Sequence, residues 1–114
     1  MESPVDSKEQ SPLAGALDAL WVRFLPEMEA RVATLESAAQ AFASNNLSEQ
    51  QQEQANTAAH KLAGVLGTFG LTRGTVLARE LEMIYSQQNG RDPALGKQLS
   101  AIAAELRAML ASRK

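Results

Sequence analysis

Apolar residues recur at intervals of three and four along most of the chain, and this spacing restricts the chain to a helical fold. At about 3.6 residues per turn, such residues share one side of an α-helix, whereas a β-strand would require strict alternation. The stripes are Leu13, Leu17, Leu20, Trp21, Phe24 and Leu25; Met28, Val32, Leu35, Ala38, Ala39 and Phe42; Val76, Leu77, Leu81, Ile84 and Tyr85; and Leu95, Leu99, Ile102, Leu106, Met109 and Leu110. The sequence therefore predicts an all-α protein.

Start and stop signals divide these stripes into five predicted helices. Their ranges are about 12–25, 26–44, 49–69, 72–88 and 93–114. Ser48 is a suitable N-cap for the third helix, and Asp92 before Pro93 is the clearest helix start in the chain. The fourth helix is expected to stop at Asn89-Gly90. Four amphipathic helices with short connections predict an antiparallel up-down four-helix bundle, to which the segment 12–25 adds an N-terminal helix.

Composition narrows the organisation and the possible partners. Residues 1–10 are polar and are predicted to form a flexible tail or linker, and residues 11–114 are predicted to form one domain. The chain has no cysteine, which excludes disulfides, thiolate metal sites and thiol catalysis. A net charge of -2 with dispersed arginines argues against nucleic acid and acidic membranes as partners. With no apolar run of signal-peptide or membrane-spanning length, we expect a cytoplasmic protein.

His60 is the only histidine, and its helix directs it away from the predicted core. At about 100° per residue, Leu62, Leu66 and Phe69 fall on the side of the helix opposite His60. Ala55, Ala58 and Ala59 lie in the same apolar sector. We therefore expect an imidazole that faces solvent.

The neighbours that follow His60 on its helix are small. Ala63, Gly64 and Gly67 occupy the positions three, four and seven residues further on. A glycine inside a helix costs about 1 kcal/mol relative to alanine, so two of them require a reason. Either a large partner must approach the imidazole closely, or a neighbouring helix packs against this surface. Both explanations are compatible with the pattern.

The segment around His60 resembles the signature of histidine-containing phosphotransfer (HPt) domains. It is similar also to the phosphoacceptor domain of chemotaxis histidine kinases, which shares the Gly-Thr-Phe-Gly run. The matching residues are Ala59-His60-Lys61-Leu62, Gly64 and Gly67-Thr68-Phe69-Gly70-Leu71. The resemblance is strongest over residues 58–82 and extends, with the predicted helix order, over about 12–112.

The resemblance implies a role in a two-component phosphorelay. His60 would accept a phosphoryl group on Nε2 from a receiver-domain aspartate or a histidine kinase and pass it to another receiver. A neutral imidazole suits this task, because its unperturbed pKa is about 6.5. The chain would be a phosphorelay intermediate rather than an enzyme, with no cofactor of its own, and the partner receiver would bring Mg²⁺. HPt domains of this type are commonly monomeric, and we expect the same here.

The resemblance also assigns roles around His60. Glu82 stands 22 residues after His60, where the family often has a Glu or Gln that hydrogen-bonds the imidazole. The family usually has lysine three residues after the histidine, and this chain has Ala63. Lys61 projects about 100° around the helix from His60 and is an imperfect substitute. Arg79, one turn before Glu82, is predicted to supply the missing positive charge.

The missing lysine favours an alternative function, that of an interaction module instead of a phosphotransfer protein. In that alternative the chain is a degenerate HPt-like bundle that docks a receiver or kinase without carrying phosphate. A zinc site is disfavoured by a single histidine and no cysteine. Gly64, Gly67 and Gly70 match neither the G-x-G-x-x-G nor the Walker pattern, and no nucleotide motif indicates a kinase.

Overall fold

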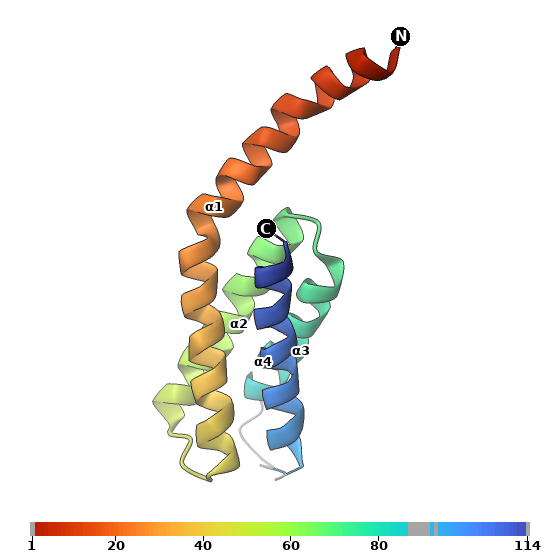
Figure 1. Ribbon diagram of the computed structural model, residues 1–114. Helices are drawn as coiled ribbons and strands as arrows, with labels where there is room; N and C mark the ends of the chain where they lie inside the picture. Colours follow the sequence, from red (N-terminus) through yellow and green to blue (C-terminus); the bar gives the residue numbers. More distant parts are fainter. Residues whose placement is uncertain (1, 87–91, 93, 114) are drawn as a thin grey trace.

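Four helices form a closed antiparallel bundle in the structure, which is a computed structural model (Figure 1). It describes residues 2–86, 92 and 94–113, with side chains from Gly15 onward. The helices are α1 (Glu2–Ala43), α2 (Glu49–Thr68), α3 (Thr72–Ser86) and α4 (Leu95–Ser112), and no strand occurs in this part of the chain. Each helix packs against the next, and α4 closes the bundle against α1. The predicted all-α, up-down bundle is confirmed.

The additional N-terminal helix is wrong as a separate element, because α1 continues through Pro26. A proline inside a helix removes one backbone hydrogen bond and crowds the preceding turn, which bends the helix. Figure 1 shows α1 bent, with its N-terminal part projecting beyond the end of the bundle. Trp21 and Met28, on either side of Pro26, are both buried in the core, so packing holds the helix together across the proline. α1 also runs through residues of the predicted tail, and the division into a tail (1–10) and a domain (11–114) stays a prediction.

The helix that carries His60 begins and ends where the sequence predicts, because both of its caps are local. Ser48 Oγ accepts the backbone N–H of Gln51 at 3.0 Å, and the Ser48 N–H donates to Gln51 Oε1 at 3.0 Å. This capping box pairs two donors that a helix start otherwise leaves free. At the other end, Gly70 adopts a φ of 74°, and its N–H and that of Leu71 close a Schellman motif. These caps fix the length and phase of α2.

The start of α4 differs from the prediction. The helix begins at Leu95, two residues beyond the expected position 93. Asp92 Oδ1 accepts the N–H of Ala94 at 3.0 Å, and the Asp92 carbonyl accepts the N–H of Leu95 at 2.9 Å. Asp92 therefore forms a turn ahead of the helix instead of capping it directly. The predicted stop at Asn89-Gly90 lies outside the described residues.

The core consists of aliphatic and small side chains from all four helices. Its largest fully buried members are Met28, Val32, Leu35, Leu62, Leu66, Leu81, Leu99, Leu106 and Leu110. α3 approaches α2 closely at Gly74, where an added Cβ would lie 2.9 Å from Leu66 Cδ1. The prediction is wrong for Val76, which is 52% exposed, because the buried side of α3 is centred on Leu77, Leu81 and Tyr85 of the same predicted stripe.

Ion pairs connect α4 to its two neighbours across the surface of the bundle. The Arg107 guanidinium donates to both carboxylate oxygens of Glu36 in α1, at 2.7 and 3.2 Å. The Arg73 guanidinium of α3 meets Glu105 in the same two-point manner, at 3.0 and 3.3 Å. No helix within the described residues is long and apolar enough to cross a membrane.

Candidate functional site

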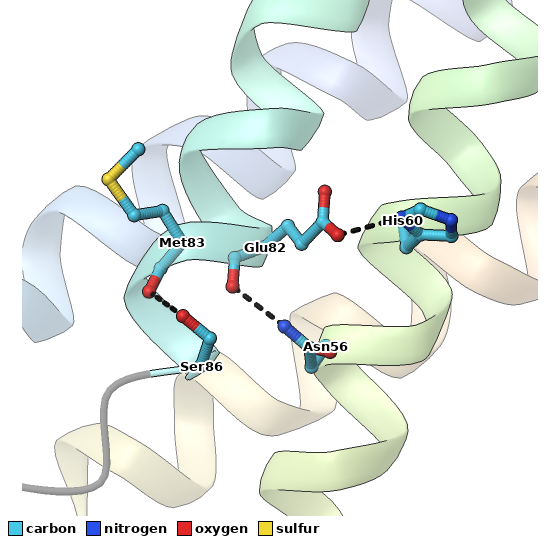
Figure 2. A network of polar contacts seen from close by, with 5 residues as sticks. All are labelled: Asn56, His60, Glu82, Met83 and Ser86. Atoms are coloured by element: carbon cyan, nitrogen blue, oxygen red, sulfur yellow. Dashed lines mark hydrogen bonds and ion pairs between the residues drawn. The ribbon is translucent and has the colours of Figure 1, made fainter.

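His60 and Glu82 form the centre of the candidate site, on the exposed side of α2 and α3. His60 Nδ1 lies 2.7 Å from Glu82 Oε2, and the two side chains are 68% and 26% exposed. Figure 2 shows the Glu82 side chain reaching across from α3 to the imidazole. The predicted exposure of His60 is confirmed, and the expected partner from the next helix is in hydrogen-bond contact.

The chemistry of the pair fixes which ring nitrogen is free. An ionised carboxylate can only accept hydrogen bonds, so Nδ1 of a neutral His60 carries the hydrogen and donates it to Glu82. The Nε2 atom then holds its lone pair on the other side of the ring. A lone pair on an exposed ring nitrogen can attack an electrophile that a partner brings.

Side-chain bonds to backbone carbonyls join α2 to α3 on both sides of the pair. Asn56 Nδ2 donates to the carbonyl of Glu82 at 2.7 Å (Figure 2). Gln52 Nε2 donates to the carbonyl of Tyr85 at 2.8 Å. Further along α2, Thr75 Oγ1 donates to the carbonyl of Ala63 at 3.4 Å. These bonds fix the axial register and the rotation of α3 relative to α2, the helix that carries His60.

Of the three residues predicted to clear space beside His60, Gly64 and Gly67 lie at the surface, and the prediction is wrong for Ala63. Gly64 and Gly67 are exposed, and an added Cβ on Gly64 would meet no atom within 4 Å. No packing within the described chain therefore accounts for a glycine at position 64. Ala63 is 1% exposed because its position on α2 faces α3, so it contributes no open surface. The place of the family's lysine is taken by a buried methyl group.

The two predicted charge partners lie on opposite sides of His60. Arg79 is exposed on α3, one turn before Glu82, and makes no ion pair with any residue that the structure describes. Because α3 runs antiparallel to α2, that turn is displaced from Glu82 toward Gly64. Lys61 is exposed and lines a shallow groove between α1 and α2 together with Arg31 and other residues. Arg79 thus lies on the side of His60 toward Glu82 and α3, and Lys61 lies on the side toward α1.

Asn56, Gln52 and Thr75 belong to this network and were not predicted from the sequence. The sequence shows that Asn56 precedes His60 by one helical turn. Its partner, however, is a backbone carbonyl, which has no sequence signature. Among the described residues no group of three or more His, Cys, Asp or Glu side chains could hold a metal ion.

Comparisons with known proteins agree with this geometry. Residues 19–112 match the family model of the Hpt domain. The chain is also similar to Protein RcaC of Microchaete diplosiphon, with 40% identity over 79 residues. That alignment covers 69% of this chain and 12% of RcaC, so the chain spans a small part of this relative's length. No solved structure matches the chain.

The family match includes the whole of the site described above. It extends from before Trp21 to the last turn of α4 and contains both His60 and Glu82. The chain therefore belongs to the Hpt domain family, whose members are phosphotransfer modules of phosphorelays.

Proposed function

We propose that the chain carries a phosphoryl group on Nε2 of His60. It takes the group from the aspartate of one receiver domain, or from a histidine kinase, and passes it to another receiver. The observation that supports this most strongly is the contact of 2.7 Å between His60 Nδ1 and Glu82 on an otherwise exposed imidazole. In a neutral imidazole this contact puts the hydrogen on Nδ1 and leaves the Nε2 lone pair open to a partner.

The transfer itself needs little equipment from this chain. The Nε2 lone pair forms a bond to phosphorus while the bond from phosphorus to the aspartate oxygen breaks, and its electrons stay on the aspartate carboxylate. The imidazole ring becomes positively charged, and Glu82 stabilises that charge through Nδ1–H. Mg²⁺ and most of the stabilisation of the transferring group come from the receiver. The bundle contributes a fixed, oriented nucleophile, and the chain acts as a relay intermediate rather than as an enzyme with its own cofactor.

Arg79 is the cation that we propose contacts the phosphoryl group once it is on His60. It is exposed, unpaired within the described part of the chain and displaced from Glu82 toward the open surface at Gly64. A guanidinium can donate two parallel hydrogen bonds to phosphate oxygens, which suits this role. Lys61, on the flank toward α1, is the weaker candidate.

Gly64 and Gly67 form the approach surface in this proposal. A receiver must bring its aspartate within bonding distance of Nε2, and a side chain at position 64 would stand between the two proteins. The open space around the Gly64 Cα supports this explanation over helix packing.

We propose that the chain works as a cytoplasmic monomer that binds one receiver at a time.

One observation favours a second candidate function. Position 63, where the family has a lysine, is an alanine in this chain, and its side chain is buried. No charge is therefore available from that position. A bundle that has lost this charge could dock receivers or kinases without carrying phosphate.

Phosphorylation by a receiver separates the two candidates. The purified chain is incubated with phosphorylated receiver domains from its source organism, and its phosphate is tested for acid lability and alkali stability. We expect such a label on the wild type and none on His60→Gln. Label that persists in His60→Gln would overturn the assignment of His60, and binding without label from every receiver would support the docking module.

A further inference from the structure

Asn56 and His60 approach the same residue of α3 from successive turns of α2. Asn56 Nδ2 donates to the backbone carbonyl of Glu82 at 2.7 Å, and the carboxylate of Glu82 meets His60 Nδ1 at 2.7 Å. Figure 2 shows the two bonds side by side, one at each end of Glu82. α2 therefore holds both the backbone and the side-chain end of one glutamate.

Glu82 lies close to the C-terminal end of its helix. α3 ends at Ser86, and the carbonyls in a last helical turn have no partners within the helix. Two of them are satisfied by side chains: Ser86 Oγ donates to Met83 O at 2.7 Å, and Gln52 Nε2 donates to Tyr85 O at 2.8 Å. The bond from Asn56 to the Glu82 carbonyl belongs to this set of side-chain bonds near the end of α3.

We propose that Asn56 is a positioning residue for His60. It holds the backbone of Glu82, keeps the carboxylate against Nδ1–H, and thereby keeps the imidazole in the tautomer whose Nε2 is free. The two neutral tautomers of a histidine are selected by the hydrogen bond that one ring nitrogen makes. Asn56 acts through Glu82, because its bond goes to that residue's carbonyl and not to the ring.

A purely structural role is the competing explanation, and Gln52 separates it from positioning. Gln52 precedes Asn56 by one turn and makes the same kind of bond, from a side-chain amide to an α3 carbonyl. Loss of either bond removes one side-chain contact between α2 and α3. Only the loss of the Asn56 bond releases the residue that contacts His60.

The test compares Asn56→Ala with Gln52→Ala by two measurements. The ¹⁵N chemical shifts of the His60 ring, recorded at pH 8.5 where imidazole is neutral, give the tautomer populations without any phosphate donor. We expect mainly the Nδ1–H form in the wild type and in Gln52→Ala, and a mixture in Asn56→Ala. The rate of phosphoryl transfer from a receiver should fall about fivefold in Asn56→Ala alone, the factor that one ordinary hydrogen bond supplies.

The outcomes are distinguishable from those of the proposed function. The effect on transfer rests on the proposed function, whereas the tautomer shift does not and stands even if His60 takes no phosphate. An unchanged tautomer in Asn56→Ala, or equal effects of both variants on tautomer and rate, would overturn the positioning role. Asn56→Ser, whose hydroxyl is too short to reach the Glu82 carbonyl, gives the same comparison if Asn56→Ala does not fold.

Discussion

Glu82 Oε2 lies 2.7 Å from His60 Nδ1, although the two residues are 22 positions apart and on different helices. Glu82 is only 26% exposed and is anchored through its carbonyl, so its carboxylate is held in place before any partner arrives. The ring, at 68% exposure, keeps one nitrogen for solvent and partners. This division between an oriented nitrogen and a free one underlies the first two predictions.

Replacing Glu82 should slow phosphorylation of His60 in proportion to the loss of acceptor strength. Glu82→Gln keeps an oxygen that accepts the Nδ1–H bond, whereas Glu82→Ala removes it. We expect a reduction of at least about tenfold for Glu82→Ala and a smaller one for Glu82→Gln, since hydrogen bonds to charged groups contribute about 1.5–3 kcal/mol. The measurement is single-turnover transfer from a phosphorylated receiver. Equal rates in all three proteins would contradict the orienting role.

Arg79→Ala should shorten the lifetime of phosphohistidine or slow its formation, because it removes the cation proposed to contact the phosphoryl oxygens. Arg79→Lys should retain part of the effect, since lysine keeps the charge but loses the two-point geometry. Arg23 is a matched control, as an exposed arginine of α1 without an ion pair among the described residues. If Arg79→Ala and Arg23→Ala behave alike, the missing lysine is not compensated at position 79.

Gly64→Ala should stabilise the protein and impair its proposed function. The added methyl group meets no atom within 4 Å, so the variant should gain about 1 kcal/mol of helix stability. The same methyl group would stand on the approach surface beside His60 and slow transfer from a receiver. Urea unfolding gives the stability, and single-turnover transfer gives the rate.

Two other glycines are controls for that prediction. Gly15→Ala in α1 also meets nothing within 4 Å, and it should leave transfer unchanged. Gly74→Ala should destabilise the protein by about 1–3 kcal/mol, because its Cβ would lie 2.9 Å from Leu66 Cδ1. Transfer that survives intact in Gly64→Ala would show that position 64 is not part of a docking surface.

Tyr85→Phe should stabilise the bundle and reduce the loss of its free energy of unfolding at alkaline pH. The Tyr85 hydroxyl is buried with no hydrogen-bond partner among the described residues, and removing it should gain about 1 kcal/mol. Burial raises the pKa of Tyr85 to about 12. An unfolded tyrosine has a pKa of about 10. The wild type therefore loses folding stability as the pH rises from about 10 toward 12, because the hydroxyl ionises in the unfolded chain while it stays neutral in the folded one, and Tyr85→Phe lacks this loss. Stability curves for both proteins that remain parallel between pH 9 and 11.5 would contradict this.

Glu36→Gln should reduce the loss of stability in acid. Hydrogen bonds from Arg107 lower the pKa of Glu36, desolvation opposes this change, and charge attraction to Arg107 adds to it. A lowered pKa means that the stabilising contribution is present above the ordinary carboxyl range and disappears as the pH falls through the folded-state pKa. Both side chains are about two-fifths exposed, at 38% and 40%, so screening limits the effect to below about 1 kcal/mol. Urea unfolding between pH 3 and 6 measures it, and identical acid limbs would contradict the pairing.

The sequence by itself determined the features that depend on local spacing. Helical periodicity placed His60 opposite Leu62 and Leu66, and the structure exposes the first and buries the others. Ser48 and Gly70 fixed the ends of α2 because a cap is formed by neighbours in the chain. These interactions need no knowledge of the other helices.

The tertiary structure decided what depends on the distance and rotation between helices. α1 continues through Pro26 because burial on both sides outweighs a local break, and no local rule contains that burial. Ala63 is buried because α3 covers that side of α2, whereas the helical pattern alone placed it beside His60 in the open. Asn56 reaches the Glu82 carbonyl only in the observed register of α2 against α3. A backbone carbonyl is present at every residue, so only packing selects which one a side chain meets.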